Sequence, residues 1–121
     1  MIGIGNDLVD IDRFRKALQR TPSLRERVFT DAECSYADAR ADPTERYAVR
    51  FAAKEAVMKA LGVGLGEINL RDIEVQRAES GAPQLVLHGT AAELAAARGV
   101  RQWLITLSHS ETVAQAIVVA L

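Results

Sequence analysis

Residues 43–62, PTERYAVRFAAKEAVMKALG, predict the longest helix of the chain. Asp42-Pro43 is a favourable helix start, because Asp is a good N-cap and Pro is tolerated in the first turn. Gly62 is a natural stop, since glycine readily adopts the left-handed conformation in which helices end. We therefore expect a central helix from Pro43 to Leu61, against which a sheet packs.

Two basic residues fall within the apolar sector of this central helix. At about 100° per residue, the sector is formed by Phe51, Val57, Met58 and Leu61. Arg50 and Lys54 project into it, and a charge among apolar side chains is costly unless something neutralises it. Two interpretations follow: a pocket that receives phosphate, or basic side chains that extend over the core edge and pair with Asp or Glu. Glu55 and Lys59, at i and i+4, are by themselves typical of a solvated ion pair.

The amino terminus predicts a strand. Residues 1–9, MIGIGNDLV, are β-branched and punctuated by glycine, as in a strand that runs out into a turn at its polar end. We expect Asp7 at that end, either held for a metal or substrate or hydrogen-bonded to its own backbone. Gly3 and Gly5 are not a dinucleotide-binding fingerprint, because Leu8 occupies the place of the third glycine.

A basic amphipathic helix is predicted from Asp10 to Arg20. Its apolar face carries Ile11, Phe14 and Leu18, at i, i+3 and i+7. A second face groups Arg13, Lys16 and Arg20. Residues 13–27 contain six basic residues against only Glu26, a balance that would steer an acidic partner. The simpler interpretation is a solvated basic face.

Two further helices are indicated by capping boxes, in which a Ser or Thr is followed three residues later by Glu. The first, Thr30–Glu33, predicts the start of a second helix. The other, Thr90–Glu93, predicts a short alanine-rich helix that Gly99 closes.

Four more strands are predicted, in two hairpins. Residues 73–75 and 85–87 flank the turn Ser80-Gly81-Ala82-Pro83, and residues 102–108 and 113–120 flank His109-Ser110-Glu111-Thr112. Together with the helices they predict an α+β fold: one compact domain over residues 1–121, with an antiparallel sheet packed against the long central helix.

Composition narrows the function classes. A chain of 121 residues with 49% hydrophobic and 26% charged residues is typical of one globular domain. Its net charge of −1 provides no overall attraction to nucleic acid. The single cysteine, Cys34, forms no internal disulfide, and no signal segment is evident, so we expect a cytoplasmic protein. The longest apolar run is far shorter than the roughly 20 residues that span a membrane.

Several common catalytic patterns are absent or weak. Neither His88 nor Cys34 has zinc-like spacing to His109, and the phosphate-loop pattern Gly-x-x-x-x-Gly-Lys is missing. Ser108 beside His109 is poor geometry for a hydrolase, because adjacent residues on an extended chain point to opposite faces. A loop histidine is more often a hydrogen-bond donor, to a phosphate or to structure.

Four segments in order resemble the holo-acyl-carrier-protein synthase family of 4'-phosphopantetheinyl transferases. They are residues 3–13, 29–33, 50–62 and 107–110, which read GIGNDLVDIDR, FTDAE, RFAAKEAVMKALG and LSHS. The FAAKEA block followed by Lys59 is the most specific. Asn6 and Asp10 depart from the residues usual in the family, but neither is a proposed ligand. The resemblance implies a trimer with coenzyme A in the cleft between subunits.

The resemblance also implies roles for single residues. Asp7 and Glu55 are similar to the family's magnesium ligands, and Lys59 to the lysine that lies against the pyrophosphate; Glu55 is also a candidate base. Contacts to coenzyme A are implied for Arg50, Lys54, Lys59, Gly62 and His109. Binding of an acidic acyl carrier protein is implied for Arg13, Lys16 and Arg20. The reaction is attack of a carrier serine on the β-phosphorus of coenzyme A, with adenosine 3',5'-bisphosphate leaving, in fatty-acid or polyketide synthesis.

Three alternatives stay open at this level. One is the same chemistry on a dedicated carrier of a polyketide or fatty-acid synthase. Another is a non-catalytic domain that keeps the basic helix for docking, although intact Asp7, Glu55 and Lys59 argue against it. The third is a magnesium-dependent phosphoester hydrolase, whose products would differ.

Overall fold

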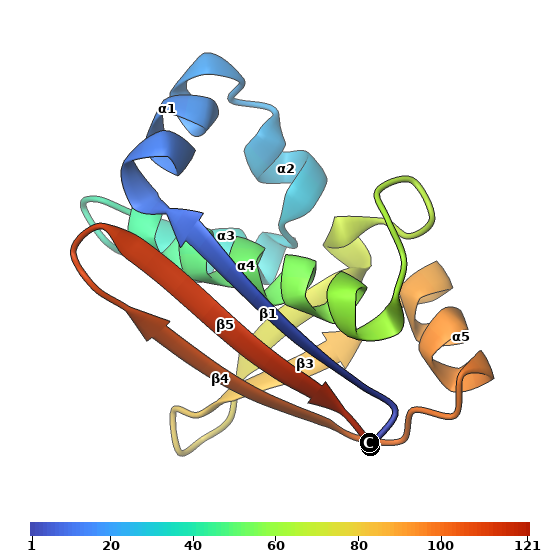
Figure 1. Ribbon diagram of the computed structural model, residues 1–121. Helices are drawn as coiled ribbons and strands as arrows, with labels where there is room; N and C mark the ends of the chain where they lie inside the picture. The colour runs from blue at the N-terminus through green and yellow to red at the C-terminus, as the bar shows by residue number, and fades with distance from the viewer.

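The computed structural model describes all 121 residues, as helices and two antiparallel sheets that surround one central helix (Figure 1). The elements in order are β1 (Gly3–Asp10), α1 (Ile11–Arg20), α2 (Leu24–Val28), α3 (Asp31–Asp38), α4 (Thr44–Leu61), the 3-10 helix η1 (Leu70–Asp72), β2 (Ile73–Arg77), β3 (Pro83–Leu87), α5 (Gly89–Ala97), β4 (Trp103–His109) and β5 (Val113–Ala120). The long helix α4 is the predicted central helix, and Gly62 ends it with φ of 69°.

The larger sheet has the strand order β1-β5-β4 and carries α4 on one face. Its central strand β5 pairs with β1 from Gly3↔Ala120 to Asp10↔Val113, and with β4 along its other edge. The residues of β5 that face α4 are all buried and mostly small: Ala114, Ala116, Val118 and Ala120. Small side chains on this face allow the helix to lie close to the sheet.

Glycines on β1 make the approach to α4 closer still. A Cβ atom at Gly5 would lie 1.8 Å from the carbonyl oxygen of Ala56, and one at Gly3 would lie 2.0 Å from that of Ala60. Only glycine fits at these two positions, so the two glycines hold β1 directly against the backbone of α4. The next inward-facing residue of β1 is Asp7.

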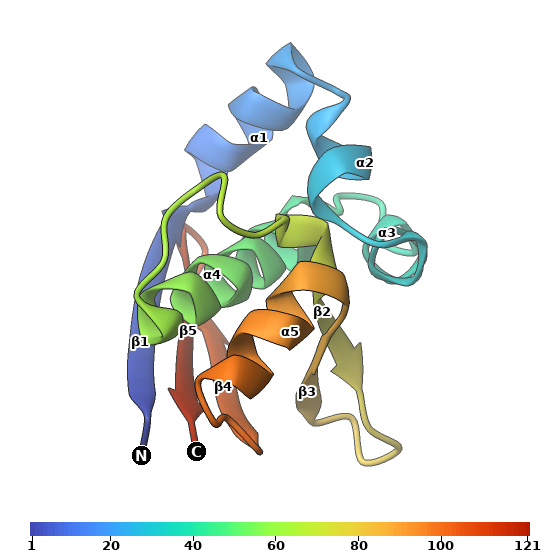
Figure 2. The same cartoon turned by 90° about the vertical axis from the view of Figure 1, so that its right-hand side faces the viewer.

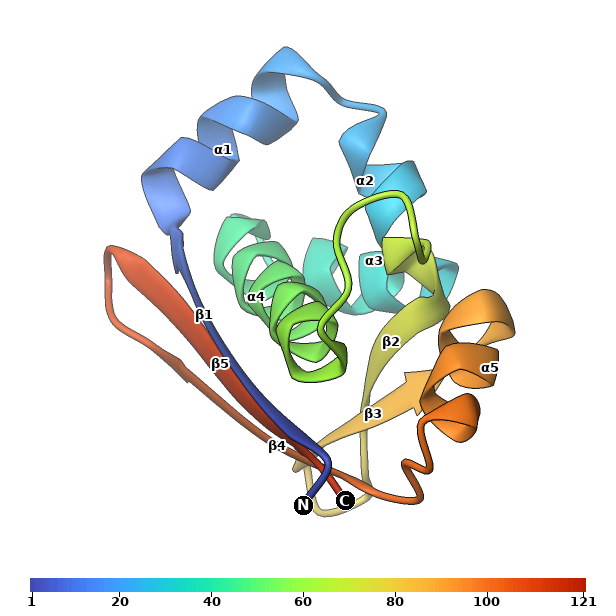
Figure 3. The same ribbon diagram turned by 45° about the vertical axis from the view of Figure 1, so that its right-hand side comes forward.

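The smaller sheet, the β2–β3 hairpin, lies on the other side of α4 (Figure 3). Ile73 and Val75 from this hairpin join the main core with residues of α4 and β5. Helix α5 lies beside the hairpin (Figure 2) and buries Ala91 and Ala95 in the same core. A smaller core beneath α2 and α3 comprises Val28, Phe29, Cys34, Ala37 and Tyr47. The structure contains no helix with the length and apolar character that a membrane span requires.

The predicted α+β architecture is confirmed, with four corrections. Asp7 lies within β1 rather than at its end, because the ladder with β5 continues to Asp10. The predicted capping box at Thr90 is wrong: α5 begins at Gly89, and Thr90 is inside the helix. The short elements α2 and η1 were not predicted, since five-residue and three-residue helices have almost no periodicity to detect. The Thr30–Glu33 capping box is present as predicted.

Candidate active site

Asp7, Glu55 and Lys59 come together where β1 crosses α4. Lys59 Nζ donates to Asp7 Oδ1 at 2.9 Å and to the Asn6 carbonyl oxygen at 2.9 Å. Glu55 lies half-buried one turn before Lys59, and its side chain and Asp7 line the same groove. The structure therefore brings together the three residues to which the sequence resemblance assigned catalysis.

The electrostatics of this cluster favour a bound cation. Burial raises the pKa of the Glu55 carboxyl above its ordinary value, and the neighbouring Asp7 carboxylate raises it further. Lys59 lowers the same pKa, but a single lysine does not balance two carboxylates. The cluster is thus suited either to hold a metal ion or to accept a proton.

A groove of about 410 Å³ extends from the carboxylates; we term it the carboxylate groove. Its apolar lining consists of Leu8, Val9, Phe14, Ala17, Leu24, Val28 and Phe51. Arg13 of α1 lines it too. A molecule that docks on α1 would therefore lie close to Asp7 and Glu55.

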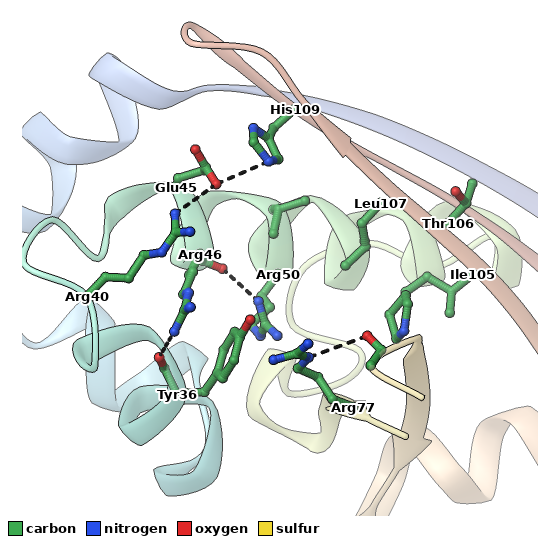
Figure 4. Close-up of a pocket in the computed structure, with 13 residues that line it drawn as sticks. Tyr36, Arg40, Glu45, Arg46, Arg50, Arg77, Ile105, Thr106, Leu107 and His109 are labelled. Carbon is green, nitrogen blue, oxygen red and sulfur yellow. Dashed lines mark hydrogen bonds and ion pairs between the residues drawn. The ribbon is translucent and has the colours of Figure 1, made fainter. Parts of the chain in front are cut away.

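A second concave site, which we term the arginine cavity, encloses about 350 Å³ (Figure 4). Its polar lining comprises Tyr36, Arg40, Glu45, Arg46, Arg50, Arg77, Thr106 and His109. Glu45 is its single acidic residue, and it pairs with His109 at 3.2 Å and with Arg40 at 3.5 Å. Four arginines and a histidine around one carboxylate create a positive cavity suited to phosphate groups.

The two predicted phosphate ligands of α4, Arg50 and Lys54, lie in different environments. Arg50 lines the arginine cavity, although it is only 5% exposed. Lys54 does not reach either site: its side chain is fully buried and pairs with Glu33 Oε1 at 2.8 Å. Its ammonium also donates to the carbonyl oxygens of Leu70 and Ile73. All three of its protons are used within the protein, so Lys54 belongs to the core and not to the coenzyme A contacts that the resemblance implied.

The basic face of α1 is exposed as predicted, with Arg13, Lys16 and Arg20 open to solvent. Lys16 is paired with Asp12 at 3.2 Å. Arg25 is turned away from this face and contacts Tyr47 and Asp38. The three exposed residues of α1, together with the exposed Arg27 of α2, carry most of the exposed charge of the predicted patch. The remaining predicted residue, Gly62, lies at the end of α4 just beyond Lys59.

A family model, the 4'-phosphopantetheinyl transferase superfamily, matches residues 3–116. The chain belongs to this superfamily. A curated holo-[acyl-carrier-protein] synthase of Moorella thermoacetica is 45% identical over 97% of the chain and 91% of the relative. Membership in the superfamily and this likeness identify the chain as an enzyme of the phosphopantetheinyl transferase type.

Solved structures of this superfamily share the fold. The structure of the Helicobacter pylori holo-[acyl-carrier-protein] synthase, in complex with coenzyme A, has a TM-score of 0.86 and 31% sequence identity. The match covers 98% of this chain and 99% of the H. pylori chain. The Bacillus anthracis enzyme, in complex with CoA (3',5'-ADP), has a TM-score of 0.82 and 34% identity, covering 98% and 95%.

The donor set at Asp7 and Glu55 fits the metal that the superfamily resemblance implied. Magnesium is a hard cation that takes one or two carboxylates and completes its octahedron with water and phosphate oxygens. Asp7 and Glu55 supply two carboxylates that share a groove. Asp10 lines the same groove but caps α1 through the Arg13 N–H, and the structure contains no cluster of three His, Cys, Asp or Glu side chains able to hold a metal ion. A softer or fully protein-coordinated metal would need more ligands.

Sequence reasoning missed Tyr36, Arg40, Arg46 and Arg77 of the arginine cavity. Arg46 had a detectable signal, because it lies four residues before Arg50 and so on the same face of α4. Tyr36 and Arg77 had none, since they come from α3 and β2 and meet Arg50 only in the folded chain.

Proposed function

We propose that this enzyme is a magnesium-dependent holo-acyl-carrier-protein synthase that transfers the 4'-phosphopantetheine group of coenzyme A to a serine of an apo acyl carrier protein in fatty-acid or polyketide synthesis. The proposal rests chiefly on the meeting of Asp7, Glu55 and Lys59, since two carboxylates and an ammonium from two elements come together beside one groove. The coenzyme A complexes of the similar H. pylori and B. anthracis enzymes support the choice of donor.

Asp7 and Glu55 would hold Mg²⁺, which when bound polarises the phosphate oxygens of the substrate and screens their charge. Lys59 neutralises charge on the pyrophosphate as it breaks. Glu55 has a carboxyl pKa raised by burial, which suits it to accept the proton of the attacking serine hydroxyl.

In the proposed reaction, the serine oxygen attacks the β-phosphorus of coenzyme A, the phosphorus that bears the pantetheine arm. A new P–O bond forms, and the bond from this phosphorus to the bridging oxygen breaks. Adenosine 3',5'-bisphosphate leaves with that oxygen, and the serine proton passes to Glu55. Arg50 and His109 bind phosphate groups of coenzyme A, for which the charge of the arginine cavity is suited.

We also propose that the enzyme is a trimer whose active site lies between subunits. The carboxylate groove and the arginine cavity share no lining residue, so one chain does not form a continuous site. The sheet face turned away from α4 carries Ile4, Leu8 and Leu104, which are 58%, 62% and 49% exposed. An exposed apolar row of this kind is typical of a surface that another subunit covers.

The decisive measurement is the intact mass of an apo acyl carrier protein after incubation with the enzyme, Mg²⁺ and coenzyme A. We expect a gain of one phosphopantetheine group, abolished by a chelator and by Asp7→Ala or Glu55→Ala. Glu93→Ala, which removes an exposed carboxylate from α5, is the matched control and should retain activity.

Two outcomes would contradict the proposal. Release of free phosphopantetheine without carrier modification would indicate a phosphoester hydrolase. No modification of any of several carriers, by folded protein that binds coenzyme A, would favour a docking module instead.

A further inference from the structure

Three arginine side chains gather around the ring of Tyr36 (Figure 4). The guanidinium carbons of Arg46, Arg50 and Arg77 lie 3.9, 4.3 and 5.0 Å from the ring centroid. Tyr36 is on α3, Arg77 is on β2, and the other two are on α4. One ring thus links three elements at the wall of the arginine cavity.

None of these three guanidinium groups has a carboxylate partner. The ion pairs of the cavity join Glu45 to Arg40 and His109 only. Arg50 is buried, its Nε has no hydrogen-bond partner, and its Nη1 donates to the carbonyl oxygen of Arg46 at 3.4 Å. Burial lowers the pKa of Arg50, while Tyr36 and Glu33 oppose this effect. The three guanidinium groups therefore carry positive charge that no carboxylate neutralises.

Like charges at this separation repel, and long arginine side chains are free to turn into solvent. An aromatic ring opposes both tendencies, because its negative face attracts each cation within about 6 Å of its centre and restricts the side chain. The Arg46 guanidinium is held further by a hydrogen bond to the Tyr36 carbonyl oxygen. Without the ring, each of the three cations would be held only by a hydrogen bond to a backbone carbonyl oxygen, of Tyr36, Arg46 and Gly81 respectively.

We propose that Tyr36 is a positioning residue for substrate binding, whose ring holds Arg46, Arg50 and Arg77 together as a preorganised cradle for a phosphate group of coenzyme A. This inference rests on the proposed function, which places phosphate in the arginine cavity. The tyrosine acts through its ring and not through its hydroxyl group. Arg46 and Arg77 become phosphate ligands alongside Arg50 and His109.

Replacing Tyr36 removes no side chain from either core cluster, because Tyr36 is only half-buried and belongs to neither of them. The test compares Tyr36→Leu, which removes the ring, with Tyr36→Phe, which removes only the hydroxyl. Trp103→Leu controls for the general loss of an aromatic side chain: Trp103 is half-buried, packs against the main core from β4 and lies outside the cavity. Steady-state kinetics are measured with coenzyme A and carrier varied separately.

For Tyr36→Leu we expect the KM for coenzyme A to rise about tenfold, the combined loss of three cation–π contacts, with kcat and the KM for the carrier changed less than twofold. Tyr36→Phe and Trp103→Leu should behave as wild type. Arg77→Gln should raise the same KM in part, and should have little further effect in the Tyr36→Leu background.

The inference is overturned if Tyr36→Leu leaves the KM for coenzyme A unchanged, or if Tyr36→Phe raises it as much as Tyr36→Leu does. If Tyr36→Leu raised the KM for coenzyme A and the KM for the carrier and also lowered kcat, its role would be structural instead. Failure of the proposed function is distinguishable, because then the wild-type enzyme itself would not modify the carrier.

Discussion

The ion pair between Lys54 and Glu33 is the most deeply buried charge in the molecule, with both side chains fully inaccessible. Burial lowers the pKa of Lys54, and the Glu33 carboxylate opposes this shift. Glu33 is satisfied in turn, since its carboxylate accepts from the backbone N–H groups of Thr30 and Val75. The pair therefore ties α3, α4 and β2 together beneath the wall of the arginine cavity.

At this residue we predict that Lys54→Met lowers the free energy of unfolding by about 3–5 kcal/mol, because it leaves Glu33 buried without a counter-charge. Urea denaturation followed by circular dichroism measures the loss. Lys59→Met is the control; its ammonium is largely exposed, so we expect it to cost less than about 1 kcal/mol.

A double variant tests whether the unpaired charge of Glu33 causes this destabilisation. Replacing both partners, as Glu33→Leu with Lys54→Met, should recover part of the stability, since an apolar pair leaves no buried charge. A loss of under 1 kcal/mol in the single variant would mean that Glu33 is accommodated in another way.

Strand β1 and helix α4 form the element pair on which the proposed catalytic cluster depends. The inward positions of β1 are Gly3, Gly5, Asp7 and Val9. The two glycines hold the strand against the helix backbone, and this contact brings Asp7 within hydrogen-bonding distance of Lys59. The glycines therefore set the geometry of the acidic pair, although they have no chemistry themselves.

For this element pair we predict that Gly5→Ala destabilises the protein by about 1–3 kcal/mol or more, because its methyl group would overlap the Ala56 carbonyl oxygen. The same displacement of β1 should lower kcat by moving Asp7 away from Glu55. Gly64→Ala is the control: its Cβ would approach nothing closer than 3.9 Å. Thermal unfolding and kcat, measured on both variants, should move together; equal stability of the two would contradict the packing argument.

Helix α1 carries exposed positive charge along the carboxylate groove. We predict that the triple variant Arg13→Glu, Lys16→Glu, Arg20→Glu raises the KM for an acidic carrier by on the order of tenfold to hundredfold, since steering becomes repulsion. Coenzyme A affinity, measured by calorimetry, should not change. The control Arg98→Glu, Arg101→Glu reverses exposed charge beyond α5 and should act as wild type.

Salt provides an independent check of that prediction. The KM of the wild-type enzyme for the carrier should rise with ionic strength, because exposed charges are screened. The triple variant should lose this increase. If the KM of the triple variant rose with ionic strength as much as that of the wild-type enzyme, α1 would be a solvated face and the carrier would dock elsewhere.

At the scale of the whole molecule, the two halves of the proposed site lie apart in one chain. The carboxylate groove is formed by β1, α1, α2 and α4, and the arginine cavity by α3, α4, β2, β3 and β4. If the active site lies between subunits, one subunit supplies the carboxylates and its neighbour supplies the arginines.

We predict that two inactive variants restore each other when co-expressed: Glu55→Gln, which lacks a carboxylate, and the double variant Arg50→Met, His109→Ala, which lacks phosphate ligands. Mixed assemblies contain some sites with both halves intact, so carrier modification should return. Differently tagged subunits allow the mixed assemblies to be purified and assayed. A mixture as inactive as its parents would place each complete site within one chain.

The exposed row on the outer sheet face belongs to the same prediction. Replacing Ile4 and Leu104 by lysine puts charges into the proposed contact between subunits, so light scattering should show a smaller species. Activity should fall with the assembly. A trimer that is insensitive to both lysines would require another interface.

The cluster of Asp7, Glu55 and Lys59 was expected only from the family resemblance, whereas sequence patterns alone determined the fold class and the bounds of the long elements. These depend on patterns that are local in the chain: the apolar period of α4 between Pro43 and Gly62, the capping box at Thr30, and the alternation of β5. The short elements α2 and η1 were missed because a few residues carry no period. Thr90 was misassigned because α5 begins two residues earlier than its capping motif predicts, with His88 as the N-cap.

Tertiary structure alone decided which charged residues line a cavity and which are buried in the core. Arg50 and Lys54 are one helical turn apart and equivalent in pattern, yet Arg50 opens to a cavity and Lys54 meets Glu33. The meeting of Tyr36 with three arginines was likewise undetectable. The reason is physical: periodicity determines which face of an element a side chain occupies, but its partner is set by the packing of elements distant in sequence.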